Sequence, residues 1–367
     1  MWNFKRNFSF LLILVILTPA FSLIYAFVDI SVFQPADIYS SETIAVSAEE
    51  RRVVIPLGTA IGVDINMEGL LVVEVSDMVT AGNQTRAPAR DAGIKPGDNI
   101  VRINGEEVQS VEEINEIIND SDADDSEPLE VEVMRGDETL NLTIAPEMCR
   151  DSGDFRIAAW VKDSTSGIGT LTFYDPENST FGALGHGITG KGGAPVNIAG
   201  GSILNSTVVS VRPSERGQIG ELRGIFLERD RQIGEIKINN EQGLYGTLDK
   251  EMLDLDDARE MSVAQKSEIR VGNAQILSNI ESVRVEKFDI EIQRIMRNTS
   301  DNTKEMVIRI TDEYLLSRVG GIVQGMSGSP IIQNDNIVGA VTHVFVNDPT
   351  RGYGISIESM LDSAYTR

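Results

Sequence analysis

The chain has 367 residues, which is enough for two folded domains of ordinary size. Its 56 acidic residues outnumber its 32 basic ones, and a formal net charge of −24 repels phosphate backbones, so we expect no nucleic-acid partner. One cysteine, Cys149, excludes an intrachain disulfide and cysteine-clustered metal sites, and two histidines, His186 and His343, exclude histidine-rich metal motifs. We therefore expect neither metal nor cofactor, and any chemistry that needs an imidazole must use one of these two side chains.

Residues 1–28 predict an export signal. Lys5 and Arg6 precede an uncharged stretch from Asn7 to Val28 that is long enough to cross a bilayer as a transmembrane helix. The basic residues before the stretch orient the rest of the chain outward. A cleaved signal peptide, with Ala20-Phe21-Ser22 as its processing site, is the alternative. Both interpretations place the remainder, which begins with a polar linker over residues 29–50, outside the cytoplasm.

Residues 51–148 predict a small α+β domain. A strand pair turns at Asn104-Gly105, and Ser110 and Glu113 have the spacing of a helix capping box. The stretch "ARDAGIKPGDNIVRINGEEVQSVEEI" resembles the circularly permuted PDZ domains of bacterial exported proteases. The resemblance implies that a peptide terminus binds at an exposed sheet edge.

A PDZ domain receives the carboxylate of its peptide on consecutive backbone N–H groups. The stretch "IPLGTAIGV", from Ile55 to Val63, is the candidate receiving loop, with Leu57, Gly58 and Thr59 at its centre. Glycine would let the loop bend so that its amides converge. The alternative is that Gly58 is an ordinary turn glycine.

Residues 155–367 predict an all-β domain. Short segments rich in Val, Ile, Thr and Phe alternate with Gly and Asn, and no strong amphipathic helix separates them. About a dozen such strands at regular spacing indicate a barrel or sandwich. Both histidines lie in this part of the chain.

The stretch "GMSGSP" contains a candidate nucleophile, Ser327. A serine hydroxyl needs a base, and the attacked carbonyl needs backbone donors, which the N–H groups of Gly325 and Ser327 could supply as an oxyanion hole. His186, between two glycines, is the candidate base, and Asp312 in "RITDEYLL" is the candidate acid. The chain order His, Asp, Ser is that of chymotrypsin-like double barrels. Each residue also has an ordinary structural interpretation, as a turn serine, a packing histidine or a solvated carboxylate.

The segments "GIGTLTFYDPENSTFGALGHGITG" and "GGIVQGMSGSPIIQNDNIVGAVTHVFVNDPTRGYGI" together resemble the stage IV sporulation protein B serine peptidases of endospore-forming bacteria. The resemblance implies a catalytic triad of His186, Asp312 and Ser327. It also implies an anchored protease in the space between the forespore and mother-cell membranes. Its protein substrate would be a membrane-bound regulator of an intramembrane protease, whose cleavage triggers a sporulation signalling cascade.

Met326 occupies the position at which chymotrypsin-like enzymes keep an aspartate, so the buried ion pair that orders their oxyanion hole cannot form. We expect activation to be controlled otherwise, with the PDZ domain as the candidate. The alternative function is a PDZ-based adaptor whose β domain keeps the protease fold without turnover.

Overall fold

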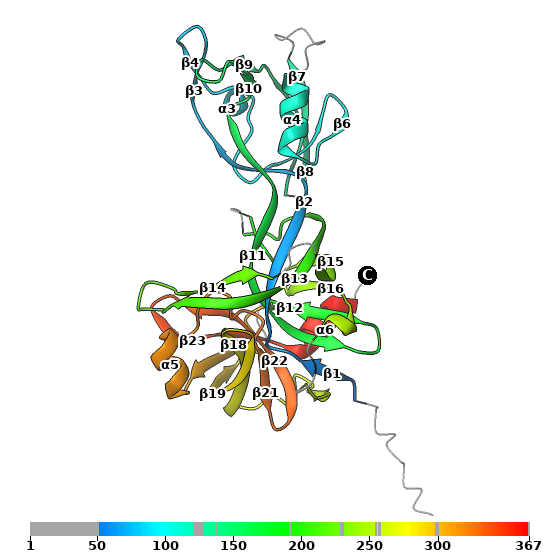
Figure 1. The fold of residues 1–367 in the computed structure, drawn as a ribbon, viewed down its shortest axis with the longest axis vertical. Helices are drawn as coiled ribbons and strands as arrows, with labels where there is room; N and C mark the ends of the chain where they lie inside the picture. Colours follow the sequence, from blue (N-terminus) through cyan, green and yellow to red (C-terminus); the bar gives the residue numbers. More distant parts are fainter. Residues whose placement is uncertain are drawn as a thin grey trace, which may run out of the picture. The chain divides into compact units, whose positions relative to one another are not determined.

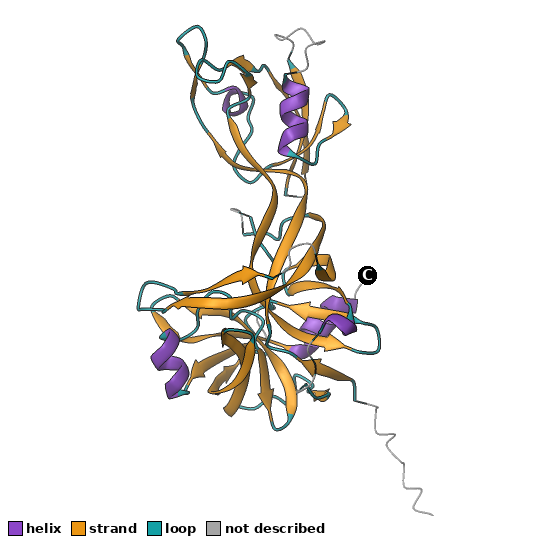
Figure 2. Cartoon of the chain, viewed as in Figure 1, coloured by secondary structure: helices purple, strands orange, loops and turns teal. Residues whose placement is uncertain are grey.

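The structure is a computed structural model that describes residues 51–119, 128–136, 138–190, 193–227, 231–253, 255, 258–297 and 301–365. Strands make up most of this part of the chain, and the helices are short (Figure 2). The predicted membrane segment and the linker lie outside the described residues. Within the described ranges no helix is long and apolar enough to cross a membrane.

Six antiparallel strands close into a first barrel (Figure 1). In ring order they are the first half of β2 (Ala60–Val75), β11 (Ala159–Asp175), β12 (Thr180–Ala183), β16 (Gly243–Leu248), β15 (Gln232–Asn240) and β13 (Ile198–Arg212), which returns to β2. Side chains such as Ile61, Leu171 and Phe181 fill its core. β14 (Glu221–Phe226) pairs with the far end of β13.

A second ring of six antiparallel strands forms another barrel. In ring order they are β18 (Gly272–Glu281), β19 (Arg284–Ile295), β20 (Met306–Ile310), β23 (Asp348–Ser356), β22 (Asn336–Phe345) and β21 (Pro330–Gln333), which returns to β18. Its core includes Ile276, Phe288 and Ile308. Two closed antiparallel barrels confirm the predicted chymotrypsin-like double barrel.

Shorter elements connect and cover the barrels. β1 (Val53–Pro56) pairs with β11 of the first barrel and with β17 (Met261–Val263), which in turn pairs with β22 of the second barrel. The remaining elements are η2 (Lys250–Met252), α5 (Glu313–Val319) and α6 (Ile357–Tyr365). Between the barrels, α6 packs its buried face into a core that it shares with residues of β1, β16 and β22.

The PDZ part has its own core, built from β5, β7 and α4 with the second half of β2. Its elements are β3 (Met78–Val79), β4 (Thr85–Arg86), α3 (Pro88–Asp91), β5 (Asn99–Ile103), β6 (Glu106–Glu107), α4 (Val111–Ile118), β7 (Leu129–Arg135), β8 (Glu138–Ile144), β9 (Glu147–Met148) and β10 (Phe155–Arg156). The predicted capping box begins α4, because Ser110 accepts the N–H of Glu113 and the Glu113 carboxylate accepts the N–H of Ser110. Asn104 and Gly105 both have positive φ, as the predicted hairpin turn requires.

Two long strands belong to both folded parts, which corrects the predicted boundaries. The first half of β2 pairs with barrel strands, whereas its second half pairs with β5. The first residues of β11, Ala159–Lys162, pair with the second half of β2, and Ala159 and Val161 pack on the PDZ core. A boundary at residue 148 or 155 therefore cuts through pairs that strand periodicity alone could not reveal.

Candidate active site

The turn that carries Ser327 is held tightly against β11. Gly325 and Gly328 have φ values of +98° and +96°, which residues other than glycine rarely adopt. A Cβ on Gly328 would lie 2.3 Å from the carbonyl oxygen of Thr170, so only glycine fits. The Thr170 hydroxyl donates to the Gly325 carbonyl at 2.6 Å, and the Thr172 hydroxyl donates to the Gly328 carbonyl at 2.8 Å. The first barrel thus fixes a turn that belongs to the second.

The Ser327 hydroxyl donates to the carbonyl of Thr342 at 2.7 Å. The hydroxyl proton is therefore held by a peptide oxygen of β22. Neither the N–H of Gly325 nor that of Ser327 donates to another described residue. Two N–H groups that have no partner among the described residues, in the turn that carries the serine, are the donors that an oxyanion hole needs.

His186 is oriented by the main chain. Its Nδ1 lies 3.0 Å from the carbonyl oxygen of Gly187, and a nitrogen facing a carbonyl must carry the proton. That tautomer leaves Nε2 as the acceptor, which is the form a general base requires. Burial lowers the pKa of His186 below its ordinary value, and the contact with Gly187 opposes this effect only in part. The imidazole is consequently neutral at pH 7.

His343 packs against His186, with ring centroids 4.8 Å apart and planes inclined by 37°. Burial, followed by electrostatic interactions with His186 and Lys304, lowers the pKa of His343 to about 4, and the carboxylate of Asp301 opposes this shift. Its Nδ1 is buried and has no hydrogen-bond partner among the described residues. His343 is therefore a second neutral imidazole beside the candidate base.

A cleft of about 990 Å³ joins these groups. Gly325, Ser327, His186 and His343 all line it. The remaining lining residues come mainly from β11, from the loops after β12 and β19, and from β22, and they include Thr165–Gly169, Asp301, Lys304 and Thr342–Val344. The geometry brings together the predicted nucleophile, base and oxyanion donors.

Asp301 is one of two acidic residues, with Glu241, that line this cleft, and sequence reasoning did not identify it. Burial raises its pKa, but hydrogen bonds from Lys304 and Thr303 outweigh that effect and hold the pKa at about 2. The ion pair between Asp301 and Lys304 measures 2.6 Å. The carboxylate is therefore ionised, and it lies near enough to His343 to affect its titration.

The structure does not place the predicted acid, Asp312, in the cleft. Asp312 is the N-cap of α5: its carboxylate accepts the N–H of Leu315 at 2.9 Å and that of Asp289 at 3.4 Å. It is not among the residues that line the cleft around His186. Helix α5 begins directly after β20, and the N–H groups of its first turn have no carbonyl partner within the helix. The Asp312 carboxylate accepts one of them. The structure therefore does not bring Asp312 into the cleft with His186, and its role as the orienting acid stays a prediction.

The predicted carboxylate-receiving loop is also corrected. The N–H groups of Leu57 and Gly58 donate to the carbonyls of Thr172 and Leu171, and the carbonyl of Thr59 accepts the N–H of Leu171. Leu57 is buried in the core of the first barrel. These amides already have partners within the barrel, so they cannot receive a peptide terminus.

Two further observations bound the site. Met326 is fully buried in the core of the second barrel. At this position, where chymotrypsin-like enzymes have an aspartate, the chain therefore has an apolar side chain packed in the core.

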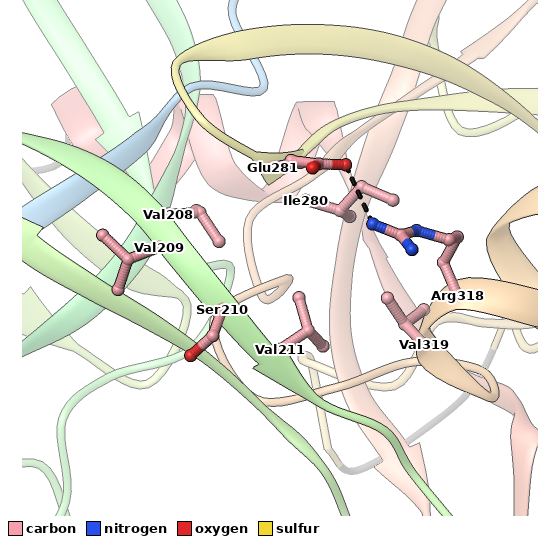
Figure 3. A pocket seen from close by; sticks show the side chains of 8 residues that line it. All are labelled: Val208, Val209, Ser210, Val211, Ile280, Glu281, Arg318 and Val319. Atoms are coloured by element: carbon pink, nitrogen blue, oxygen red, sulfur yellow. Dashed lines mark hydrogen bonds and ion pairs between the residues drawn. The ribbon is translucent and has the colours of Figure 1, made fainter.

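A smaller pocket of about 160 Å³ lies between β13, β18 and α5 (Figure 3). Its one ion pair, Arg318 with Glu281 at 3.0 Å, is exposed, and its one hydroxyl belongs to Ser210.

Comparison with known proteins identifies the family and the PDZ domain. A family model described as SpoIVB peptidase S55 matches residues 153–361, more than half of the chain, and a PDZ domain model matches residues 59–145. The PDZ match begins at a residue that the structure places in the first barrel. A relative from Agrobacterium fabrum, whose name describes a zinc metalloprotease, is 28% identical over 150 residues. Those residues cover 34% of this chain, and the chain spans only 39% of that relative's length.

Two solved structures are similar in part. The PDZ domain of an SdrC-like protein from Listeria monocytogenes is 22% identical, with a TM-score of 0.22, over 27% of this chain and 93% of that one. The active form of a protease from M. tuberculosis is 15% identical, with a TM-score of 0.30, over 55% of this chain and 76% of that one. Since both scores are low, the fold rests on the strand pairings. Among the described residues no group of three or more His, Cys, Asp or Glu side chains could hold a metal ion.

Proposed function

Because the chain belongs to the SpoIVB peptidase S55 family and carries a PDZ domain, we propose that it is a serine endopeptidase in which Ser327 is the nucleophile and His186 the general base. One observation carries the proposal: both side chains line one cleft beside two backbone N–H groups that have no partner among the described residues. The Ser327 oxygen would attack the scissile carbonyl while Nε2 of His186 takes its proton. The N–H groups of Gly325 and Ser327 would bind the oxyanion, and His186 would return the proton to the leaving amine.

In the observed arrangement the base is oriented by a peptide carbonyl. Gly187 occupies the Nδ1 side of His186, where a triad would place a carboxylate. A carbonyl fixes the tautomer but stabilises the imidazolium less than a carboxylate does, so we expect a slow enzyme. The Ser327 hydroxyl must also leave the Thr342 carbonyl, which a rotation about its Cα–Cβ bond accomplishes.

The finer biological role rests on the apolar stretch at residues 7–28 and on the family. We propose that the chain acts outside the cytoplasmic membrane, held there by its N-terminal segment, and that it cleaves a membrane-bound regulator of an intramembrane protease during sporulation. In non-sporulating cells that express the chain and whose wall has been removed, an added protease should degrade the folded part of the chain if it is exported. Full protection in these cells, with degradation after lysis, would refute export.

Labelling with a fluorophosphonate probe tests the peptidase itself, because only an activated serine reacts. Ser327→Ala should abolish labelling. Ser329 is the matched control: it is fully buried and its hydroxyl bonds Ser278 at 3.1 Å, so Ser329→Ala should keep labelling and lose about 1 kcal/mol of stability. A parent protein that never labels would favour the alternative of a non-catalytic PDZ adaptor, which the Ser327–Thr342 hydrogen bond also fits.

A further inference from the structure

β11 has one edge that no strand covers over most of its length. One edge pairs with β2 from Ala159 to Thr170. Along the other edge, among the described residues, pairing begins at Thr170, whose carbonyl accepts the N–H of Leu184, and continues from Leu171 with β12. An extended edge with unpaired N–H and C=O groups is a template for another strand.

The hydrogen-bond pattern shows which residues turn their peptide groups to this open edge. Val72, opposite Val161, donates its N–H to Asp98 and accepts the N–H of Gly97, so it faces away from β11. Val72 and Val161 are therefore a pair without mutual hydrogen bonds, in which each residue turns its peptide groups away from the other strand, so the N–H and C=O of Val161 point to the open edge.

The same reasoning applies nearer the catalytic turn. The N–H of Leu171 donates to Thr59, which makes the preceding pair, Thr170 with Ala60, one whose peptide groups point away from each other. Alternation along the strand then turns the peptide groups of Ile168 and Ser166 to the open edge as well. Both of these residues line the cleft that holds Ser327.

The edge therefore runs along one strand from the catalytic cleft to the PDZ part, and the pairing with β2 shifts register between Trp160 and Val161 and between Lys162 and Ser164. The ten residues from Ala159 to Ile168 span roughly 33 Å when extended. At the PDZ end, Ala159 and Val161 pack on the same core as α4. Asn119, the C-cap of α4, bonds the N–H of Phe155 just before β11 begins. Trp160 is 67% exposed there, a large apolar surface left for a partner.

We propose that the open edge of β11 is the docking strand for substrate, and that an extended segment of a protein substrate adds to it from the scissile bond as far as α4. The inference rests on the proposed peptidase function and identifies the class of substrate: unfolded or loop segments that continue for about eight residues on one side of the cleaved bond. Short peptides that end near the cleft would lack most of the edge. Substrates would then be selected by backbone pairing along β11, and Trp160 and α4 would contact the substrate side chains that lie farthest from the cleaved bond.

Val161→Pro tests the edge. Proline removes one open-edge N–H and leaves the ladder with β2 intact, because the N–H of Val161 is not part of that ladder. Val161→Ala, which trims the same side chain but keeps the N–H, is the matched control. Both changes are made in the full chain, in detergent, and also combined with Ser327→Ala so that peptides are retained without turnover.

A proteome-derived peptide library, analysed by mass spectrometry, is the ligand. The Ser327→Ala chain should retain peptides longer than about ten residues, and Val161→Pro should reduce retention about three- to tenfold while Val161→Ala does not. In the active chain, cleaved bonds should lie about eight or more residues from one peptide end. Fluorophosphonate labelling should stay within about twofold of the parent in both Val161 variants.

Equal retention of peptides by the Val161→Pro and parent chains would contradict the proposal. Frequent cleavage of short peptides that have no more than three residues on either side of the cleaved bond would contradict it as well. A dimer in sedimentation that Val161→Pro dissociates would assign the edge to a second copy. A monomer that retains no peptide would leave the edge without a ligand, and both results contradict the proposal. Absence of labelling with normal retention would refute the peptidase and leave the docking strand standing.

Discussion

At the residue scale, burial decides the protonation of the two cleft histidines. Transfer of an imidazolium from water into a packed interior is costly, so the neutral form is favoured in the folded chain. The pKa of His186 is lowered by burial and that of His343 lies at about 4. A neutral His186 can accept the Ser327 proton, and a neutral His343 can lie against it without repulsion.

The pH dependence of labelling follows from His186. Because the neutral imidazole is the active form and its pKa is lowered, labelling should persist as the pH falls and should decline only below 6.5, the ordinary histidine value. Fluorophosphonate labelling rates measured between pH 4 and 8 show at which pH the labelling declines. A midpoint at or above pH 7 would contradict the buried environment described for this ring.

The free energy of unfolding should also decrease as the pH falls. The pKa of His343 in the folded chain, about 4, lies below its unfolded value, so between these values the unfolded chain binds more protons and the free energy of unfolding rises with pH. Acidification from pH 7 towards 4 should thus lower the melting temperature. His343→Gln should flatten this dependence, and an unchanged slope in that variant would indicate that other groups cause it.

The two imidazoles should differ in their importance for chemistry. His186→Ala should reduce turnover by several orders of magnitude, as loss of a base does, whereas His343→Ala should cost roughly tenfold through lost packing. Labelling rates and circular dichroism of both variants separate activity from folding. The reverse order would make His343 the base.

At the scale of elements, the start of α5 shows how local chemistry can occupy a residue that a motif assigns to catalysis. Asp312 follows β20 and caps the helix, and Gly320 ends the helix with a φ of +72°. An aspartate before a helical segment that ends in glycine is a capping pattern visible in "TDEYLLSRVGG". That signal predicts the position of Asp312 better than its distance from Ser327 does.

Substitution of Asp312 distinguishes the two roles. Asp312→Asn keeps a good N-cap and should leave labelling within about threefold of the parent, whereas Asp312→Ala should lose about 1 kcal/mol of stability. Labelling rates and thermal unfolding of both variants give the answer. A loss of about 10⁴-fold in Asp312→Asn, with unchanged stability, would mean that Asp312 reaches His186 in a catalytic state with a different arrangement.

At the scale of the whole molecule, the residues that precede the PDZ part complete the peptidase. Gly58 lies against the second barrel: a Cβ there would approach the carbonyl oxygen of Leu277 to 2.7 Å, and its φ is +75°. Since the neighbouring amides pair with β11, this segment holds the first barrel to the second. A change at Gly58 should therefore affect folding and catalysis together and should not act on peptide recruitment alone.

Gly58→Ala should lower stability by about 1–3 kcal/mol and reduce labelling in parallel. Gly93→Ala is the control, because Gly93 also has positive φ, +94°, but has nothing within 4 Å of its would-be Cβ. The difference between their melting temperatures measures the contact with Leu277. Normal stability and labelling in Gly58→Ala, with impaired binding of library peptides, would restore the predicted receiving loop.

The sequence by itself determined the local features and the candidate chemistry. The turn at Asn104-Gly105, the capping box of α4 and the glycines around Ser327 depend on neighbouring residues, so they could be predicted from short stretches. With only two histidines, the set of possible bases was equally small. Only the tertiary structure decided that both histidines share one cleft, that Asp301 lines it while Asp312 caps a helix, and that β2 and β11 each serve two folded parts. These outcomes depend on strand register and barrel closure between residues more than a hundred positions apart, and period-2 patterns along a single strand contain no information about its partner.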